Sequence, residues 1–329
     1  MAKKQKRNFR ASPKKLSITG GIAALALFVL VLLNEAMGTN LPLPSVGELQ
    51  ELLDGAYTST GLSAPPAQVE GGLTVHYIDV EQADCELIQT EEQNVLIDAG
   101  DQGMGDQIGS YLRAQGVETI DLLIATHPHA DHIGSMAEIV KQFEIKKVLF
   151  AEVPDSLTPT SKTYERLLDA IADKRLKITK VQPGNRYELG GGAVLDILGP
   201  QRKYENDLND NSVVCRVAFG ERAFLFTGDA GKDSEDDMMD AYSMENFRAD
   251  VLKLGHHGSS TANQEKWVKA VQPSLAIASC GYDNKYGHPH REVVQLMEKM
   301  KIPLYRTYET GTVVVHTDGE SLEIHKEKE

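Results

Sequence analysis

Four residues that can bind metal ions stand close together in the run Thr-His-Pro-His-Ala-Asp-His at residues 126–132. They are His127, His129, Asp131 and His132, and the run follows an apolar segment and precedes a helical pattern. Side chains two residues apart in an extended segment point to the same side, so His127 and His129 can bind one ion. The turn into the helix directs Asp131 and His132 towards a second ion. Imidazole and carboxylate ligands together suit zinc, with manganese and iron as alternatives.

Two later motifs supply further candidate ligands. The run Phe-Leu-Phe-Thr-Gly-Asp-Ala at 224–230 places Asp229 at the end of an apolar strand, where a carboxylate can bridge two ions. A Gly-Asp pair alone is typical of a turn, and the histidine run is what favours a ligand. The run Leu-Gly-His-His-Gly-Ser-Ser at 254–260 contains adjacent histidines, whose side chains point in different directions after a strand. We expect one to bind metal, with His256 preferred, and the other, His257, to face the substrate.

Three more polar residues are candidates for supporting or catalytic positions. His288 lies in a constrained Gly-His-Pro turn, and we expect it, with His257, to stabilise negative charge or to protonate a leaving oxygen. Asp98 ends a strand and can hydrogen-bond the ligand run. Ser259 follows the paired histidines and can support a ligand or contact the substrate. The alternatives are a plain surface loop for His288 and a turn for Asp98.

The segments around these motifs alternate between strand and helix patterns. Short β-rich runs bounded by turn residues predict strands at 73–80, 85–90, 94–100, 121–126, 146–150, 177–181, 193–198, 213–219, 222–227, 250–254, 274–279, 303–307, 312–316 and 321–325. Helical spacing of apolar residues predicts helices at 106–114, 133–143, 164–172, 236–247, 264–271 and 291–300. Strands mixed with helices in this way predict an α/β domain at 72–329 with two sheets flanked by helices.

Composition narrows the class of protein. The chain has 329 residues, of which 41% are hydrophobic and 25% charged, which excludes a wholly disordered protein. Three cysteines exclude a disulfide-dense scaffold and a zinc site built from four cysteines. Beyond residue 15, 27 basic residues face 48 acidic ones, a net charge of −21. This acidic body argues against binding nucleic acid through a basic surface, but not against a nucleic acid held by metal ions.

The N-terminal region has the pattern of a membrane anchor. Residues 1–15 contain seven basic residues and no acidic one, and residues 16–33 contain no charge. A helix over 16–33 spans about 27 Å, close to the ~30 Å hydrocarbon core of a membrane. The positive-inside rule then predicts a cytoplasmic tail, a transmembrane signal anchor, and a linker at 34–71 leading to an extracytoplasmic domain. The alternative is a cleaved signal and a secreted protein, although the residues after Leu33 match a cleavage site poorly.

The motifs, taken in this order, resemble the metallo-β-lactamase superfamily. THPHADHIG, FLFTGDA and LKLGHHGSS more specifically resemble the hydrolase domain of ComEC-type DNA-uptake proteins and their free-standing relatives, and VHYIDVEQADCELI, LNDNSVV and NKYGHP fit the same group. The resemblance covers about residues 73–316. It implies a four-layer αββα sandwich with a binuclear metal site at one edge.

The chain departs from that family pattern in two places. The relatives usually carry glycines where this chain has Glu81 and Ala83. Many superfamily members also place a histidine ligand between the histidine run and the bridging aspartate, and this chain has none there. The ComEC-like group has an Asn-x-Ser-type run instead, matched by Asn209, Asn211 and Ser212, and we expect Asn211 and Ser212 to support a ligand or contact the substrate.

The resemblance favours a phosphodiester substrate, either a nucleic acid or a cell-wall polymer. It implies that a water molecule activated by two divalent ions attacks the substrate, and that Asp131 ligates the second ion and helps to orient that water. One alternative is a lactam or other ester hydrolase, and another is a membrane-tethered binding module without turnover. The sequence predicts no protein partner.

Overall fold

The computed structural model describes residues 71–328, which lie within the compact unit Pro66–Glu329. The predicted basic tail, the predicted membrane anchor and nearly all of the predicted linker lie outside the described residues. Within residues 71–328, no helix has both the length and the apolar character needed to cross a membrane.

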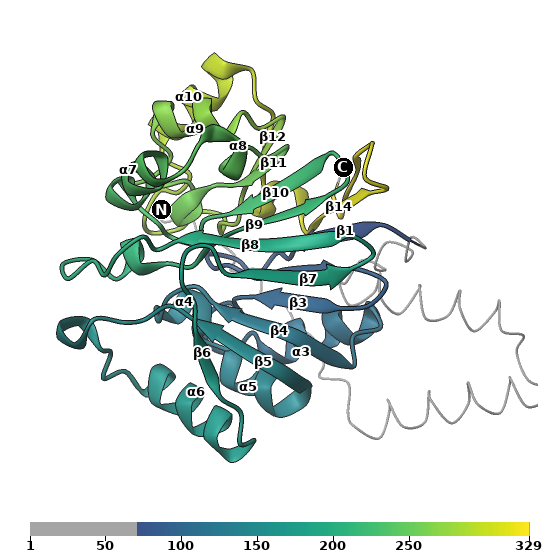
Figure 1. The fold of residues 1–329 in the computed structure, drawn as a ribbon, viewed down its shortest axis with the longest axis vertical. Coiled ribbons are helices and arrows are strands. Elements are labelled where there is room, and N and C mark those ends of the chain that lie inside the picture. The colour runs from purple at the N-terminus through teal and green to yellow at the C-terminus, as the bar shows by residue number, and fades with distance from the viewer. Residues whose placement is uncertain (1–70, 329) are drawn as a thin grey trace, which may run out of the picture. The chain divides into compact units, whose positions relative to one another are not determined.

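Two sheets form the centre of this unit (Figure 1). The first sheet has the strand order β15-β14-β1-β2-β3-β4-β5-β6, and the second has the order β13-β12-β11-β10-β9-β8-β7. The strands of the first sheet are β1 (Leu73–Tyr77), β2 (Glu86–Gln89), β3 (Asn94–Ile97), β4 (Thr119–Ala125), β5 (Glu144–Phe150), β6 (Ile178–Lys180), β14 (Val313–Thr317) and β15 (Glu323–Lys326). Those of the second are β7 (Arg186–Gly190), β8 (Ala193–Gly199), β9 (Val214–Phe219), β10 (Arg222–Phe226), β11 (Val251–Lys253), β12 (Leu275–Ala278) and β13 (Leu304–Arg306).

Helices cover the outer faces of the two sheets (Figure 1). The α-helices are α3 (Gly105–Ala114), α4 (Ala130–Ile133), α5 (Met136–Gln142), α6 (Lys162–Asp173), α7 (Lys232–Ala241), α8 (Met244–Phe247), α9 (Glu265–Val271), α10 (Arg291–Met300) and α11 (Thr307–Thr310). Short 3-10 turns are η1 (Asp155–Leu157), η2 (Asn209–Asn211) and η3 (Gly255–Gly258).

Three apolar clusters explain this layering. Strand side chains alternate between the two faces of a sheet, so Val95 and Ile97 of β3 pack between the sheets while Leu96 packs against the helices of the first sheet. The helices α7 to α10 cover the second sheet through a further cluster that includes Trp267. Full burial of a side chain of this size stabilises the fold by roughly 1.5–3 kcal/mol. The resulting order is helices, sheet, sheet, helices, which confirms the predicted mixed α/β fold with two sheets.

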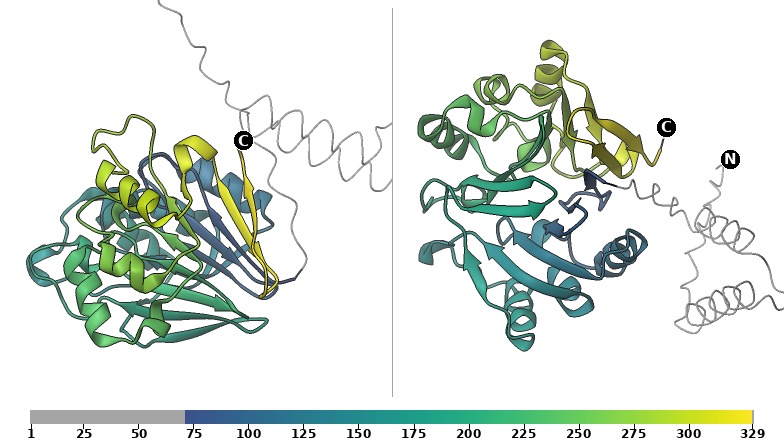
Figure 2. Two further views of the ribbon diagram at one scale, coloured as in Figure 1. Left: turned by 90° about the horizontal axis from the view of Figure 1, so that it is seen from above. Right: turned by 45° about the vertical axis from the view of Figure 1, so that its right-hand side comes forward.

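The chain returns late to complete the first sheet. β14 pairs antiparallel with β1, so strands from the two ends of the described chain lie side by side (Figure 2). In the middle of each sheet the strands run parallel, as β3, β4 and β5 do in the first and β10, β11 and β12 in the second. Loops at the carboxyl ends of parallel strands are the usual place for ligands in α/β folds.

Two predicted helices differ from the observed ones. The predicted helix at 133–143 is divided at Ser135, which has a φ of −105° and a ψ of 4° and whose hydroxyl donates a hydrogen bond to the carbonyl of Asp101. The predicted helix at 236–247 begins earlier, at Lys232, where the carboxylate of Asp210 accepts hydrogen bonds from backbone N–H groups of the first turn. It also ends earlier, at Ala241, and β7 was not predicted at all.

Candidate metal centre

Loops from both sheets bring the predicted ligand residues together. The run 127–132 follows β4 of the first sheet, Asp229 follows β10 of the second, and the adjacent histidines follow β11 in η3. The backbone N–H of His256 donates a hydrogen bond of 3.0 Å to the carbonyl of Gly228, which joins the last two loops. The sandwich therefore assembles at one edge the residues that the sequence analysis singled out.

A first group of possible ligand atoms comes from His127, His129 and Asp229. One ligand atom from each residue lies within 4.8 Å of the others. Nε2 of His127 is 2.9 Å from Nδ1 of His129 and 3.8 Å from Oδ2 of Asp229. His127 and Asp229 are buried and His129 is partly exposed, so one side of this group is open to solvent.

A second group comes from Asp131, His132 and His257. Nε2 of His257 is 3.4 Å from Oδ2 of Asp131. Asp229 completes this group as well, because its Oδ1 lies 3.2 Å from Nε2 of His132 and 3.7 Å from Nε2 of His257. The two oxygens of Asp229 thus face different groups, as a carboxylate that bridges two ions must.

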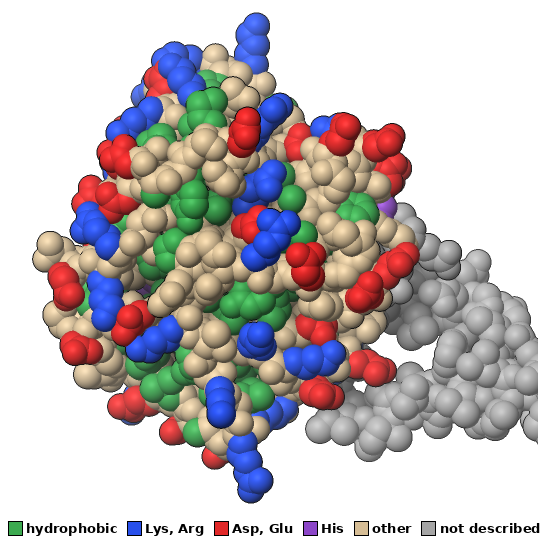
Figure 3. All heavy atoms as spheres, viewed as in Figure 1, with side chains coloured by type: hydrophobic (Ala, Val, Ile, Leu, Met, Phe, Trp, Pro, Cys, Tyr) green, Lys and Arg blue, Asp and Glu red, His purple; other side chains and the backbone are tan. Residues whose placement is uncertain are grey.

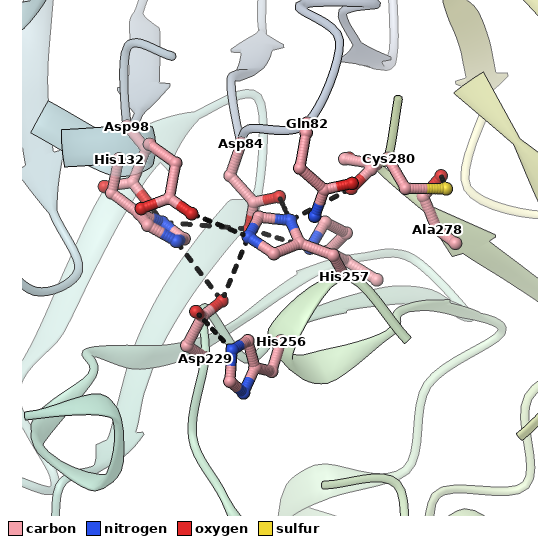
Figure 4. Close-up of polar contacts among 12 residues, drawn as sticks. Gln82, Asp84, Asp98, His132, Asp229, His256, His257, Ala278 and Cys280 are labelled. Carbon is pink, nitrogen blue, oxygen red and sulfur yellow. Dashed lines mark hydrogen bonds and ion pairs between the residues drawn. The ribbon is translucent and has the colours of Figure 1, made fainter. Parts of the chain in front are cut away.

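The close-up in Figure 4 shows the side chains converging: His132 from α4, Asp229 from the loop after β10, and His256 and His257 from η3. Three buried atoms at this point have no hydrogen-bond partner: Nε2 of His132, Nε2 of His257 and Oδ1 of Asp229. Leaving such an atom unsatisfied costs about 1–3 kcal/mol. One cation bound among these three atoms would remove that cost, so the residues fit the metal ion that the motifs imply.

The charges in the site also favour a cation. Burial lowers the pKa of His257, but the carboxylates of Asp229 and Asp84 outweigh burial and raise it to about 10. Burial raises the pKa of Asp229, and the imidazoles of His132 and His257 outweigh burial and hold it well below its ordinary range. Several buried carboxylates therefore create a negative potential around the imidazoles, which a divalent ion would neutralise.

Asp98 holds His132 in place. Its Oδ2 lies 2.7 Å from Nδ1 of His132, which leaves Nε2 of that ring to face Asp229. Asp98 also accepts hydrogen bonds from the backbone N–H and the hydroxyl of Thr126, at 2.8 and 2.6 Å. A carboxylate behind the ring fixes both the tautomer and the orientation of a metal-binding histidine. This is the position that the sequence analysis predicted for Asp98.

Ser212 is placed to support the first group. Its hydroxyl is 3.2 Å from Nδ1 of His127 and accepts a hydrogen bond of 3.1 Å from the backbone N–H of Asp229. The serine therefore touches one residue from each sheet. It lies behind the ligand atoms and does not face the open side.

Asn211 and Ser259, expected to support a ligand or contact the substrate, make loop contacts, and Ser259 reaches Nδ1 of His256 through the hydroxyl of Thr261. The side chain of Asn211 hydrogen-bonds the backbone of Tyr204 and Asp207, so it braces the loop before β9. The hydroxyl of Ser259 accepts hydrogen bonds from the backbone and the hydroxyl of Thr261. Both polar groups are occupied by loop contacts within the fold.

The adjacent histidines are separated by an unusual backbone. His256 and His257 both adopt left-handed conformations, with φ of 49° and 54°. His257 is buried and joins the second group, whereas His256 belongs to neither group and has a quarter of its side chain exposed. Nε2 of His256 lies 3.5 Å from Oδ2 of Asp229, and its Nδ1 is 3.0 Å from Thr261 Oγ1. This geometry reverses the sequence-based preference for His256 as the ligand.

His288 lies over the paired histidines. Its ring centroid is 5.3 Å from that of His256 and 6.0 Å from that of His257. The side-chain amide of Gln82 accepts from the backbone N–H of Gly281, so its NH₂ group donates to Nδ1 of His288 at 3.3 Å. Burial, together with His257 and His256, lowers the pKa of His288 to about 4. At neutral pH this ring therefore carries its proton on Nε2 and can donate one hydrogen bond.

The sequence analysis missed a buried ion pair behind the site. Nζ of Lys253 lies 2.7 Å from Oδ2 of Asp84, and each side chain is only 1% exposed. Oδ1 of the same aspartate lies 3.1 Å from Nδ1 of His257, which also donates to the carbonyl of Ser279 at 2.9 Å. Figure 4 shows Asp84 on the side of His257 that faces away from Asp229. The sequence does contain one indication of this ion pair, because Lys253 lies within an otherwise apolar strand.

Lys253→Met is expected to lower the free energy of unfolding by about 3 kcal/mol at neutral pH. The substitution leaves Asp84 as a buried carboxylate without the cation that holds its pKa low. Urea unfolding of the chain in EDTA measures the effect without a contribution from bound metal. Adding Asp84→Asn to the same variant should recover part of the loss, because the uncompensated charge is then gone.

Lys266→Met is the matched control for that variant. Lys266 forms a surface ion pair of 2.7 Å with Asp236, and about half of each side chain is exposed. Its loss should cost less than about 1 kcal/mol. Equal losses in the two lysine variants would show that the Lys253 ion pair contributes no more than a surface contact.

Comparisons with known proteins place this geometry in context. The family profile described as "Metallo-beta-lactamase superfamily" matches residues 78–282. ComE operon protein 3 of Bacillus subtilis (strain 168) is 28% identical over 308 residues, which are 92% of this chain and 36% of that protein. Competence protein ComA of Neisseria gonorrhoeae is 29% identical over 250 residues, which are 76% of this chain and 33% of that protein. The chain thus spans about a third of the length of these relatives.

One solved structure to which the chain is similar is that of the metallo-beta-lactamase fold protein YhfI from Bacillus subtilis. It is 14% identical, with coverage of 71% of this chain and 95% of that chain and a TM-score of 0.45.

Proposed function

Because the chain belongs to the metallo-β-lactamase superfamily, as its motifs predicted, we propose that it is a metal-dependent hydrolase with a binuclear centre. The observation that carries this proposal is the placement of Asp229, whose two carboxylate oxygens face two separate groups of histidines and carboxylates. When bound, two divalent ions supply an activated water molecule and neutralise charge on the substrate.

Each ion has a proposed set of ligands. His127, His129 and Asp229 would hold the first ion, and Asp131, His132 and His257 would hold the second together with Asp229. Nitrogen and oxygen donors of this kind suit zinc, and manganese and iron remain the alternatives. The first set has only two histidines, so we expect water to complete it on its open side.

Other residues act directly on the substrate in this proposal. His288 presents Nε2–H, since Gln82 donates to its Nδ1, and can hydrogen-bond an oxygen on which negative charge develops. His256 is more exposed than His257 and lies at the rim beside Asp229, where it can contact the substrate or the leaving group. The partly exposed carboxylate of Asp131 can accept a hydrogen bond from the attacking water and orient it.

We further propose that the substrates are phosphodiesters, either nucleic acid or cell-envelope phosphodiesters. The resemblance to ComEC-type proteins and the similarity to competence protein ComA support this class. On the face drawn in Figure 3, basic and acidic side chains alternate without one extended patch of either sign. Because the chain beyond residue 15 carries a net charge of −21, attraction for a phosphate is expected to come mainly from the two ions.

Metal-dependent hydrolysis of bis(p-nitrophenyl) phosphate by the full chain tests the proposed function. We expect turnover with zinc or manganese, loss of turnover in EDTA, and recovery when the metal is returned. Hydrolysis of a lactam without hydrolysis of the phosphodiester would replace this function with the lactam alternative. Stoichiometric metal binding without turnover of either would favour a binding module.

The proposed location is the outer face of the cell membrane. Its support is the pattern of seven basic residues followed by 18 uncharged ones. These residues lie outside the described range, so the location and the membrane contact through residues 16–33 stay predictions.

A further inference from the structure

The loop after β12 brings exposed aromatic rings next to the metal centre. We call residues 279–290 the tyrosine loop, because Tyr282 is 83% exposed and Tyr286 is 50% exposed. Within residues 71–328, the exposed large hydrophobic side chains are Ile178, Met244, Tyr282, Tyr286 and Ile324. Two of these five therefore lie within one short loop, in the same segment as His288.

A stack of rings connects this surface to the proposed ligands. The ring of His288 lies 6.0 Å from that of His257, with an angle of 27° between the ring planes. The ring of Tyr286 lies 5.5 Å from that of His288, with an angle of 20°. Tyr286 is thus the outermost of three roughly parallel rings that begin at the second group of ligand atoms.

The tyrosine loop is held in shape before any substrate arrives. The side chain of Asn284 accepts from the backbone N–H of His288 at 2.9 Å and donates to the carbonyls of Gly281 and His288. Gln82, from the loop between β1 and β2, holds both Gly281 and His288. These contacts fix the tyrosines relative to the metal centre, which reduces the entropy lost on binding.

A cavity of about 390 Å³ opens beside these rings. Tyr282 and Tyr308 line it, with ring centroids 5.9 Å apart, and His288 lines it on the side of the metal centre. Two charged residues line the cavity, Arg306 and Asp283, and Arg306 also forms an ion pair with Glu309. Lys285 lies nearby, with its Nζ 4.8 Å from the centroid of the Tyr286 ring. The cavity therefore offers aromatic faces with cations close to them.

We propose that the tyrosine loop is a stacking subsite for a nucleobase of a single-stranded nucleic acid, that of the nucleoside bonded to the phosphodiester at the metal centre. This inference rests on the proposed function and names its substrate class. Exposed aromatic rings near cations bind single strands, because every unpaired base offers a flat face and every phosphate a negative charge. In a duplex the faces of the bases are stacked on one another and are not accessible to a protein side chain. A quaternary ammonium would also suit aromatic rings and Asp283 in the cavity wall, so a choline ester is included in the test.

Two esters of matched reactivity test this subsite in the metal-loaded full chain. Thymidine 5′-(p-nitrophenyl) phosphate carries a base, and methyl p-nitrophenyl phosphate carries none. We expect Tyr286→Ala and Tyr282→Ala to lower the ratio of kcat/KM for the two esters, thymidine over methyl, by about tenfold. Tyr→Phe at either position should keep the ratio, since the ring remains. Ile178 is exposed on the edge strand β6, so Ile178→Ala is the control, and it should also keep the ratio of kcat/KM for the two esters.

A binding measurement separates failure of the subsite from failure of the proposed function. Fluorescence anisotropy of a labelled oligothymidylate with the metal-loaded chain needs no turnover, and we expect about tenfold weaker binding in the two alanine variants. If neither ester is hydrolysed but the variants lose binding, the hydrolase proposal fails and the subsite stands. An unchanged ester ratio with unchanged binding overturns the subsite. A selective loss on p-nitrophenyl phosphorylcholine overturns it in favour of a choline site.

Discussion

Asp229→Asn is expected to lower kcat/KM for bis(p-nitrophenyl) phosphate by about 10³–10⁴-fold and to reduce bound metal. The carboxylate has one oxygen towards His127 and the other towards His132 and His257. An amide has one oxygen of reduced charge and one NH₂ group, so it can satisfy only one of the two groups. Metal analysis of the purified variant and steady-state kinetics with added zinc measure the two effects separately.

Asp240→Asn is the matched control for that substitution. Asp240 is an exposed residue of α7, and its variant should keep both the metal content and the rate of the unaltered chain. If Asp229→Asn also keeps both, Asp229 is a turn residue and the bridging arrangement is wrong.

His257→Ala and His256→Ala are both expected to lose activity, but only His257→Ala is expected to lose metal. His257 is buried with Nε2 in the second group, so its loss should remove one ion and reduce turnover by about 10³-fold, with partial recovery in excess metal. His256 lies at the rim, so its loss should leave metal bound and reduce turnover by about 10²-fold. Metal content measured with and without excess zinc, together with kcat, distinguishes the two.

His325→Ala controls for loss of an exposed histidine, on β15. The assignment of His257 is contradicted if His256→Ala is the variant that loses metal. That outcome would restore the ligand preferred from the sequence alone.

The ligand run and the overall layering could be predicted because both depend on local patterns. Four metal-binding side chains within residues 127–132 identify a site whatever surrounds them, and β-rich runs bounded by turn residues, such as the one that contains β3, indicate strands. The two sheets follow from those strands. The order of the motifs along the chain added the resemblance to the metallo-β-lactamase superfamily.

Residues whose position depends on distant partners were harder to predict. Asp84 and Lys253 are 169 positions apart in sequence, and only the folded sandwich joins them behind His257. The choice between His256 and His257 depends on two consecutive left-handed residues, which adjacency in the sequence does not indicate. Glu81 has a φ of 62°, a left-handed conformation that favours glycine and that the sequence does not indicate for a glutamate.

The proposed ions are held by side chains from both sheets, since His127 to His132 follow β4 and Asp229 and His257 follow strands of the second sheet. Metal binding would thus cross-link two layers that are otherwise joined mainly by apolar packing. A ligand that binds only the folded state raises its stability by RT ln(1 + [L]/Kd), or about 2.7 kcal/mol at a hundredfold excess over Kd. Heat denaturation in a series of divalent ions can therefore rank the metals before any substrate is known.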